Sequence, residues 1–130
     1  MLKLALKFLR NLALAAAGFA VLILAIATAQ AAGALAVGAC GAFGYGFDYR
    51  TEASARAAAM SKCTAAGCRV VGVVHRGCAA MAVDSRNPCG SFGWALHGHL
   101  GKAENISMQR CYEYGGRDCV VRAWACDERG

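Results

Sequence analysis

Eight cysteines constrain this 130-residue chain more than any other feature. All of them lie within residues 40–126, and an even number of cysteines in a small exported domain is typical of a disulfide framework. The C-x2-C pairs of a zinc ribbon are absent, because the intervals between cysteines are 22, 4, 9, 10, 21, 7 and 6 residues. The pattern therefore predicts four disulfide bonds that stabilise a core too small to be comfortably stable alone.

The first residues have the layout of a secretory signal peptide. Lys3, Lys7 and Arg10 precede an apolar run at 12–27, and A-x-A sites suited to cleavage follow this run. An uncleaved membrane anchor is the alternative, but the strongly apolar part of about 16 residues is shorter than the roughly 20 that a spanning helix needs. We expect a cleaved signal peptide at 1–31 and a secreted or periplasmic protein, which meets the membrane only through the leader if that is uncleaved.

The net charge of the mature chain is small. Three of the 14 Lys and Arg residues lie in the leader, which leaves 11 against 8 Asp and Glu residues and a net charge of +3. Domains that bind nucleic acids carry a clustered basic surface instead. We therefore expect no nucleic-acid partner.

A short phrase occurs twice, as "CGAFGY" at 40–45 and as "CGSFGW" at 89–94. Aligning the two halves on these phrases gives every cysteine a counterpart, with small shifts in spacing. A unit this short cannot bury its own apolar face, so two such units need a common core. The sequence predicts two internal repeats, at 40–78 and 89–126.

Each predicted repeat contains the same kinds of elements. Aromatic residues alternate with small ones in "GAFGYGFDY", which indicates a strand, and the glycines opposite the aromatics indicate close packing, here by the facing half. Thr51 is placed to cap the helix that follows. The expected strands are 41–49, 68–75, 78–84, 90–97 and 119–126, and the expected helices are 53–60 and 102–111.

This order of elements predicts an α+β fold. Two pseudo-symmetric β-α-β units are expected to share one antiparallel or mixed sheet of about five strands, with both helices on one face. The single domain spans 40–126, a flexible segment at 32–39 precedes it, and a tail at 127–130 follows it.

Four of the cysteines flank equivalent turns. Cys63 ends the first predicted helix and Cys68 begins the next strand, so the turn can bring their Cα atoms within the ~4.4–6.8 Å that a disulfide needs. Cys111 and Cys119 occupy the same place in the second half. We predict the bonds Cys63–Cys68 and Cys111–Cys119, and three pairings stay open for Cys40, Cys78, Cys89 and Cys126.

Cys40 has an alternative role. The segment "VGAC" at 37–40 loosely matches a bacterial lipobox, in which the cysteine is lipidated after cleavage. Gly38 fits that motif poorly, and lipidation would leave Cys89 without a partner, which is unusual in an exported protein. We expect a disulfide at Cys40.

The chain contains a Gly-rich aromatic strand, an Ala-rich helix ending in Cys, the strand "CRVVGVVH" and the segment "CAAMA" at 78–82, and the order of strand, helix and cysteines then repeats. In this pattern there is a resemblance to the bacterial domain of unknown function 4189. It covers 41–126 and implies a small exported protein, with no known activity or catalytic residues. Cys40 and Cys89 are additional to the six cysteines associated with the family, which favours Cys40–Cys89 with Cys78–Cys126.

The histidines are the candidate residues for chemistry. His97 and His99 are two positions apart, and on a strand they would share a face and could reach one metal ion. No acidic third ligand is near them in sequence, whereas metal sites need three or four ligands. His75 could act with Asp84 and Ser85 as a hydrolytic triad, but no nucleophile elbow is present.

The aromatic residues are the candidates for binding. Tyr45 and Trp94 occupy equivalent repeat positions and are expected to meet near the pseudo-twofold axis, with Tyr49 completing a patch for a protein or glycan. Large aromatic residues mostly serve packing, which is the alternative. The other aromatic candidates are Tyr112, Tyr114 and Trp124.

Two function classes follow from these patterns. The sequence favours a non-enzymatic binding or inhibitor-like module of the cell envelope, a monomer whose partner is a protein or another envelope component. The alternative is a small hydrolytic or metal-dependent periplasmic enzyme that uses His75, or His97 and His99. We expect no cofactor.

Overall fold

Two three-stranded antiparallel sheets form the centre of the domain. The computed structural model describes residues 7, 9–12 and 31–127, so most of the expected signal peptide and of the tail lies outside the described residues. The elements are β1 Ala32–Val37, the 3-10 helix η1 Ala39–Gly41, β2 Phe43–Tyr49, α2 Glu52–Lys62, β3 Arg69–Val74, β4 Cys78–Asp84, β5 Phe92–His97, α3 Leu100–Glu113 and β6 Cys119–Cys126. Within the described part, no helix is long and apolar enough to cross a membrane.

The prediction of a single shared sheet is wrong. The first sheet has the strand order β2-β1-β3 and the second has the order β5-β4-β6. β1 pairs with both β2 and β3, and β4 pairs with both β5 and β6, so each half of the chain completes a sheet of its own. Each half has the order strand, strand, helix, strand in place of the expected β-α-β unit. Duplication of the sequence stays a prediction.

The prediction of a flexible segment at 32–39 is wrong. β1 is instead the central strand of its sheet, and all six of its residues are buried. Its sequence, AGALAV, is small and apolar on both faces, so it lacks the polar alternation of a half-exposed strand and continues the composition of the leader. The predicted boundary at residue 40 therefore cuts off the strand on which the first sheet depends.

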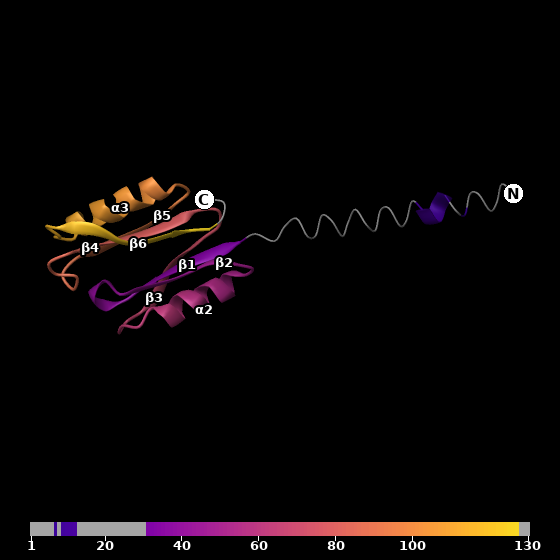
Figure 1. The fold of residues 1–130 in the computed structure, drawn as a ribbon. Coiled ribbons are helices and arrows are strands. Elements are labelled where there is room, and N and C mark those ends of the chain that lie inside the picture. The colour runs from indigo at the N-terminus through magenta and orange to yellow at the C-terminus, as the bar shows by residue number, and fades with distance from the viewer. Residues whose placement is uncertain (1–6, 8, 13–30, 128–130) are drawn as a thin grey trace.

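The two sheets pack face to face, and one helix covers each outer face (Figure 1). On β1, Ala34 and Ala36 pack against α2, whereas Leu35 and Val37 pack against the second sheet. β4 shows the same alternation, because Ala80 and Ala82 lie toward α3 while Ala79, Met81 and Val83 lie between the sheets. The prediction of both helices on one face is therefore wrong, since each sheet needs a helix on the face that the other sheet leaves open.

Glycines on β2 and β5 allow the helices to approach closely. A Cβ atom on Gly44 would collide with backbone atoms of α2 at Ala59 and Lys62, and one on Gly93 would collide with α3 at Ser107. The expected close packing therefore exists, but the neighbour is the helix of the same half and not the facing half. Both helices begin and end within two residues of the expected ranges. Thr51 Oγ1 accepts the Ser54 N–H at 3.1 Å as the expected cap.

Four disulfides connect these layers, and no described cysteine is free. Cys63–Cys68 and Cys111–Cys119 each join the end of a helix to the start of the following strand. Cys78–Cys126 joins opposite residues of β4 and β6, and Cys40–Cys89 connects the two halves. These are the pairings that the spacing and the family resemblance favoured.

The lipobox alternative at Cys40 is wrong. Lipidation would require cleavage immediately before Cys40, which would remove β1 from the centre of its sheet. The Cys40 sulfur is also bonded to Cys89.

The close approach of α2 to β2 generates a prediction. We expect Gly44→Ala to lower the free energy of unfolding by about 1–3 kcal/mol or more, because the added methyl group collides with the backbone of α2 and pushes this helix away from its sheet. Denaturant unfolding followed by circular dichroism measures the effect. Gly101→Ala is the control: a Cβ atom there meets nothing within 4 Å, so this variant should be as stable as the native protein or more so. Equal stability of the native protein and Gly44→Ala would contradict the packing.

Candidate functional site

The three aromatic residues of the expected patch lie on different parts of the surface. Tyr45 lies on the edge strand β2, where the Lys62 ammonium sits 4.9 Å from its ring centre. Trp94 is half-buried on β5, and Arg110 lies 5.5 Å over its ring while donating a 2.6 Å hydrogen bond to its carbonyl. β2 lies beside β6 whereas β5 lies beside β3, so Tyr45 and Trp94 are on opposite sides of the sandwich. Tyr49 packs against the cluster between β1 and α2.

Exposed apolar side chains gather on β6 instead. Trp124 is 57% exposed, Val120 42% and Val121 36%, and all three belong to this one strand. Among the described strands, β6 is hydrogen-bonded only to β4, so the backbone groups on its outer side have no strand partner there. We call this strand, with its exposed residues Val120, Val121, Arg122 and Trp124, the β6 edge.

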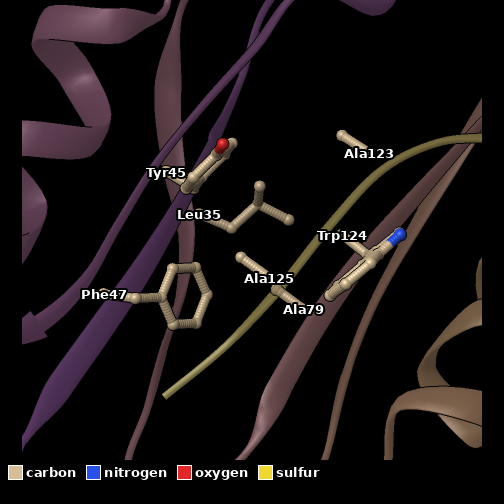
Figure 2. A pocket seen from close by; sticks show the side chains of 7 residues that line it. All are labelled: Leu35, Tyr45, Phe47, Ala79, Ala123, Trp124 and Ala125. Carbon is tan, nitrogen blue, oxygen red and sulfur yellow. The ribbon is translucent and has the colours of Figure 1, made fainter. Parts of the chain in front are cut away.

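An apolar crevice runs between β6 and β2 (Figure 2). Tyr45 and Phe47 from β2 face Ala123 and Ala125 from β6 across it, and the crevice is too narrow to admit water. The Trp124 ring lies on the other side of β6, as alternation along the strand requires. The β6 edge therefore presents apolar groups on both of its faces.

Arg122 interrupts the pairing of β6. Ala82 lies opposite Val121 and Met81 lies opposite Ala123, so Arg122 is an extra residue without a partner on β4. This is the arrangement of a β-bulge, which bends an edge strand locally. Arg122 has no ion-pair partner among the described residues. The sequence "VVRAWA" indicates that β6 is exposed, because a charged residue interrupts an apolar run that would otherwise indicate a buried strand.

The three histidines lie at the end of the sandwich where β3, β4 and β5 meet the loops. His75 Nε2 is 2.8 Å from Glu52 Oε1 at the start of α2, and this contact raises the pKa of His75. The rings of His97 and His99 are 5.8 Å apart, and His97 Nδ1 accepts the His99 backbone N–H at 3.0 Å. Among the described residues, no group of three or more His, Cys, Asp or Glu side chains is arranged to hold a metal ion.

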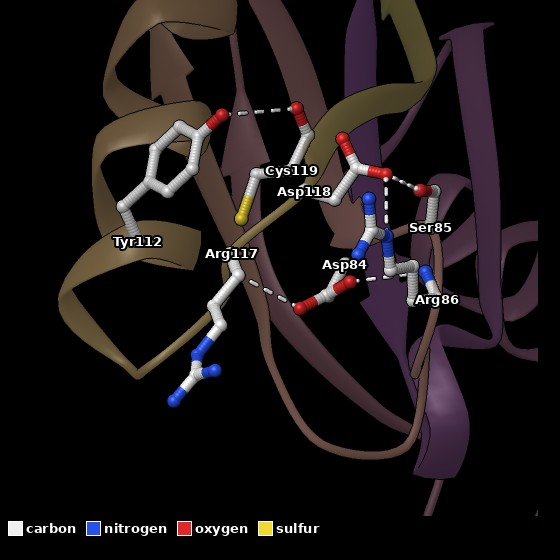
Figure 3. Close-up of polar contacts among 7 residues, drawn as sticks. All are labelled: Asp84, Ser85, Arg86, Tyr112, Arg117, Asp118 and Cys119. Carbon is white, nitrogen blue, oxygen red and sulfur yellow. Dashed lines mark hydrogen bonds and ion pairs between the residues drawn. The ribbon is translucent and has the colours of Figure 1, made fainter.

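His75 lies at the opposite end of the molecule from Asp84 and Ser85, the other two residues of the hydrolytic triad considered above. His75 precedes β4 and Ser85 follows it, and a strand of seven residues separates them by about 20 Å. Ser85 Oγ donates to Asp118 Oδ2 at 2.7 Å, while Asp84 accepts the backbone N–H groups of Arg86 and Arg117 (Figure 3). Asp84 thus holds two loops together instead of orienting a histidine.

The ion pair of His75 has a consequence for titration. Because Glu52 stabilises the imidazolium, the pKa of His75 lies above its ordinary value of about 6.5 in the native protein, and Glu52→Gln should lower it. NMR titration of the ring protons measures this shift, and Glu104→Gln on α3 is the matched control. The contact between protonated His75 and Glu52 stabilises the folded protein below the ordinary pKa of His75. This contribution to the free energy of unfolding is lost as the pH rises through the raised pKa of His75. An unchanged His75 titration in Glu52→Gln would contradict the ion pair.

Asp84 titrates in the opposite sense. Its two backbone hydrogen bonds lower the pKa of the carboxyl group, so its contribution to stability is present above about pH 4 and is lost as the pH falls through the lowered pKa. We expect the free energy of unfolding of Asp84→Asn to depend less on pH in this acidic range, as measured by urea unfolding at a series of pH values. Asp118→Asn should retain the full acid dependence that Asp84 contributes. The same acid dependence in Asp84→Asn and the native protein would contradict this role.

Comparison with known proteins identifies a family for this chain. A family model described as a domain of unknown function matches residues 32–126, which include β1 and all the elements that follow it. No curated protein and no solved structure matches the chain. The four disulfides fit an extracytoplasmic compartment, where such bonds persist. The chain belongs to the family of the domain of unknown function DUF4189.

Proposed function

We propose that this domain is a non-enzymatic binding module of the cell envelope that captures an extended segment of a partner protein along β6. The observation that carries the proposal is the β6 edge, where Val120, Val121 and Trp124 are exposed beside an unpaired backbone. An extended peptide can add to such an edge as a further strand, with main-chain hydrogen bonds for affinity and side-chain contacts for specificity.

The charge of the edge favours a partner segment that contains an acidic residue. Arg122 is the one charged residue on β6 and has no ion-pair partner among the described residues. An Asp or Glu opposite Arg122 would supply that partner, while apolar residues of the segment would cover Val121 and Trp124. Trp is among the residues that contribute most when buried at an interface.

A second copy of the chain is a poorer occupant of this edge. Antiparallel pairing of two β6 strands centred on the bulge would place Arg122 opposite Arg122, and like charges directly opposite each other are destabilising. Bulges and charged residues on edge strands also discourage such self-association in general. This argument favours a different chain as the partner.

The compartment is part of the same proposal. Residues 1–31 act as a cleaved signal peptide, and cleavage at this point would leave β1 complete, because that strand begins at Ala32. The mature domain then folds in an oxidising compartment where its four disulfides form. Support for this comes from the cysteine content and from the layout of the leader.

A charge-reversal experiment tests the proposed function. Two fluorescent peptides of alternating Thr and Val, one with a central Glu and one with a central Lys, are titrated with the mature protein and followed by anisotropy. The native protein should prefer the Glu peptide by about three- to fivefold, the size expected for an exposed ion pair. Arg122→Glu should reverse this preference, and Trp124→Ala should weaken binding of both peptides about tenfold or more.

The control is Arg69→Glu, the same change of charge on the edge strand β3 of the other sheet. It should leave the preference for the Glu peptide unchanged. Failure of the native protein to bind either peptide, or an unchanged preference in Arg122→Glu, would contradict the proposal.

A further inference from the structure

A shallow surface cavity of about 280 Å³, largely open to solvent, lies between the turn that joins β3 to β4 and the end of β5. It is separate from the β6 edge, because β5 and β6 lie on opposite sides of β4. Its lining combines an apolar part with basic groups. The lining residues are Val73, Val74, His75, Arg76, Gly77, Leu96, His97 and Gly98.

Among the described residues, no acidic side chain lines this cavity, and the two carboxylates that act on His75, those of Asp127 and Glu52, already have partners. Asp127 is only 2% exposed and accepts the backbone N–H groups of Arg76 and Gly77. Glu52 pairs with His75 and with Arg56 on its own helix. Among the residues that line the cavity, the one permanently charged group is therefore the Arg76 guanidinium, which is positive.

Arg76 is the central group of this site. Its guanidinium has no hydrogen-bond or ion-pair partner among the described residues, so its donors are available to a ligand. Its backbone has φ of 55°, a left-handed conformation that is uncommon for a residue with a side chain. The buried Asp127 carboxylate holds this conformation by accepting the Arg76 N–H. Strained residues that the surrounding structure fixes in this way cluster at functional sites.

We propose that this cavity binds a small organic oxyanion with a short apolar body, its carboxylate or phosphate group held by Arg76 and His97. The guanidinium offers paired N–H donors that match the oxygens of either group. Val73, Val74 and Leu96 form the apolar part of the lining and would cover the body of the ligand. The volume of the cavity, about 280 Å³, lies just below the roughly 300–1,000 Å³ of drug-sized ligand sites, so the ligand must be small.

Isothermal titration of the mature protein with benzoate, phenyl phosphate and acetate tests this inference. Benzoate and phenyl phosphate distinguish the two head groups, and acetate lacks the apolar body. We expect saturable binding of at least one of the two aromatic anions at millimolar concentration and weaker binding of acetate. Arg76→Gln should weaken the binding by about tenfold or more, as expected for loss of charge-assisted hydrogen bonds.

Arg69→Gln is the matched control, because it removes the same charge from the far end of β3. It should leave the affinity unchanged, and thermal unfolding should show that both variants are folded. NMR shift changes that centre on His97 and Gly98 would locate the ligand independently of Arg76. The inference is overturned if neither aromatic anion binds, if acetate binds as tightly as benzoate, or if the two variants lose affinity equally.

Discussion

The rest of the structure depends on the burial of two central strands on both of their faces. β1 and β4 each lie between two neighbouring strands, a covering helix and the opposite sheet, and every residue of both strands is buried. This is possible because most of these residues are small. Ala34 and Ala36 admit α2, Ala80 and Ala82 admit α3, and the larger Leu35 and Met81 fill the space between the sheets. A core built on alanine buries little apolar surface per residue, so covalent bonds are needed as additional stabilisation.

The disulfides and the two candidate sites follow from this arrangement. Cys63–Cys68 fixes α2 to β3, and Cys111–Cys119 fixes α3 to β6. Cys78–Cys126 joins β4 to β6, and Cys40–Cys89 connects the two halves. The sandwich leaves edge strands on both sides, and one of them, β6, carries exposed apolar groups together with Arg122, which has no ion-pair partner among the described residues. The loops at one end carry Arg76 and the histidines, and those at the other end are held by Asp84.

Local chemistry was predictable from the sequence, whereas the arrangement of the layers was not. Thr51 caps α2 as its side chain suggests, and the cysteines on either side of each helix turn pair with each other. β1 could not be recognised, because AGALAV follows the apolar leader and has no polar face. Missing that strand turned two sheets into one and placed both helices on one face. The exposure of Trp124 depends on which strand lies at the edge of its sheet, and Arg122 is the sequence signal that indicates an exposed β6.

The central claim is that β1 is an integral, fully buried strand of the domain. Hydrogen–deuterium exchange of the mature protein, resolved by residue with NMR, tests it most directly, because amides of a central strand exchange only when the structure opens globally. We predict that the amides of residues 33–37 are protected to the same degree as those of β4, and more than those of the edge strand β6. Rapid exchange at residues 33–37, with β4 still protected, would contradict the two-sheet structure and would show that this segment is the flexible terminus its sequence suggests.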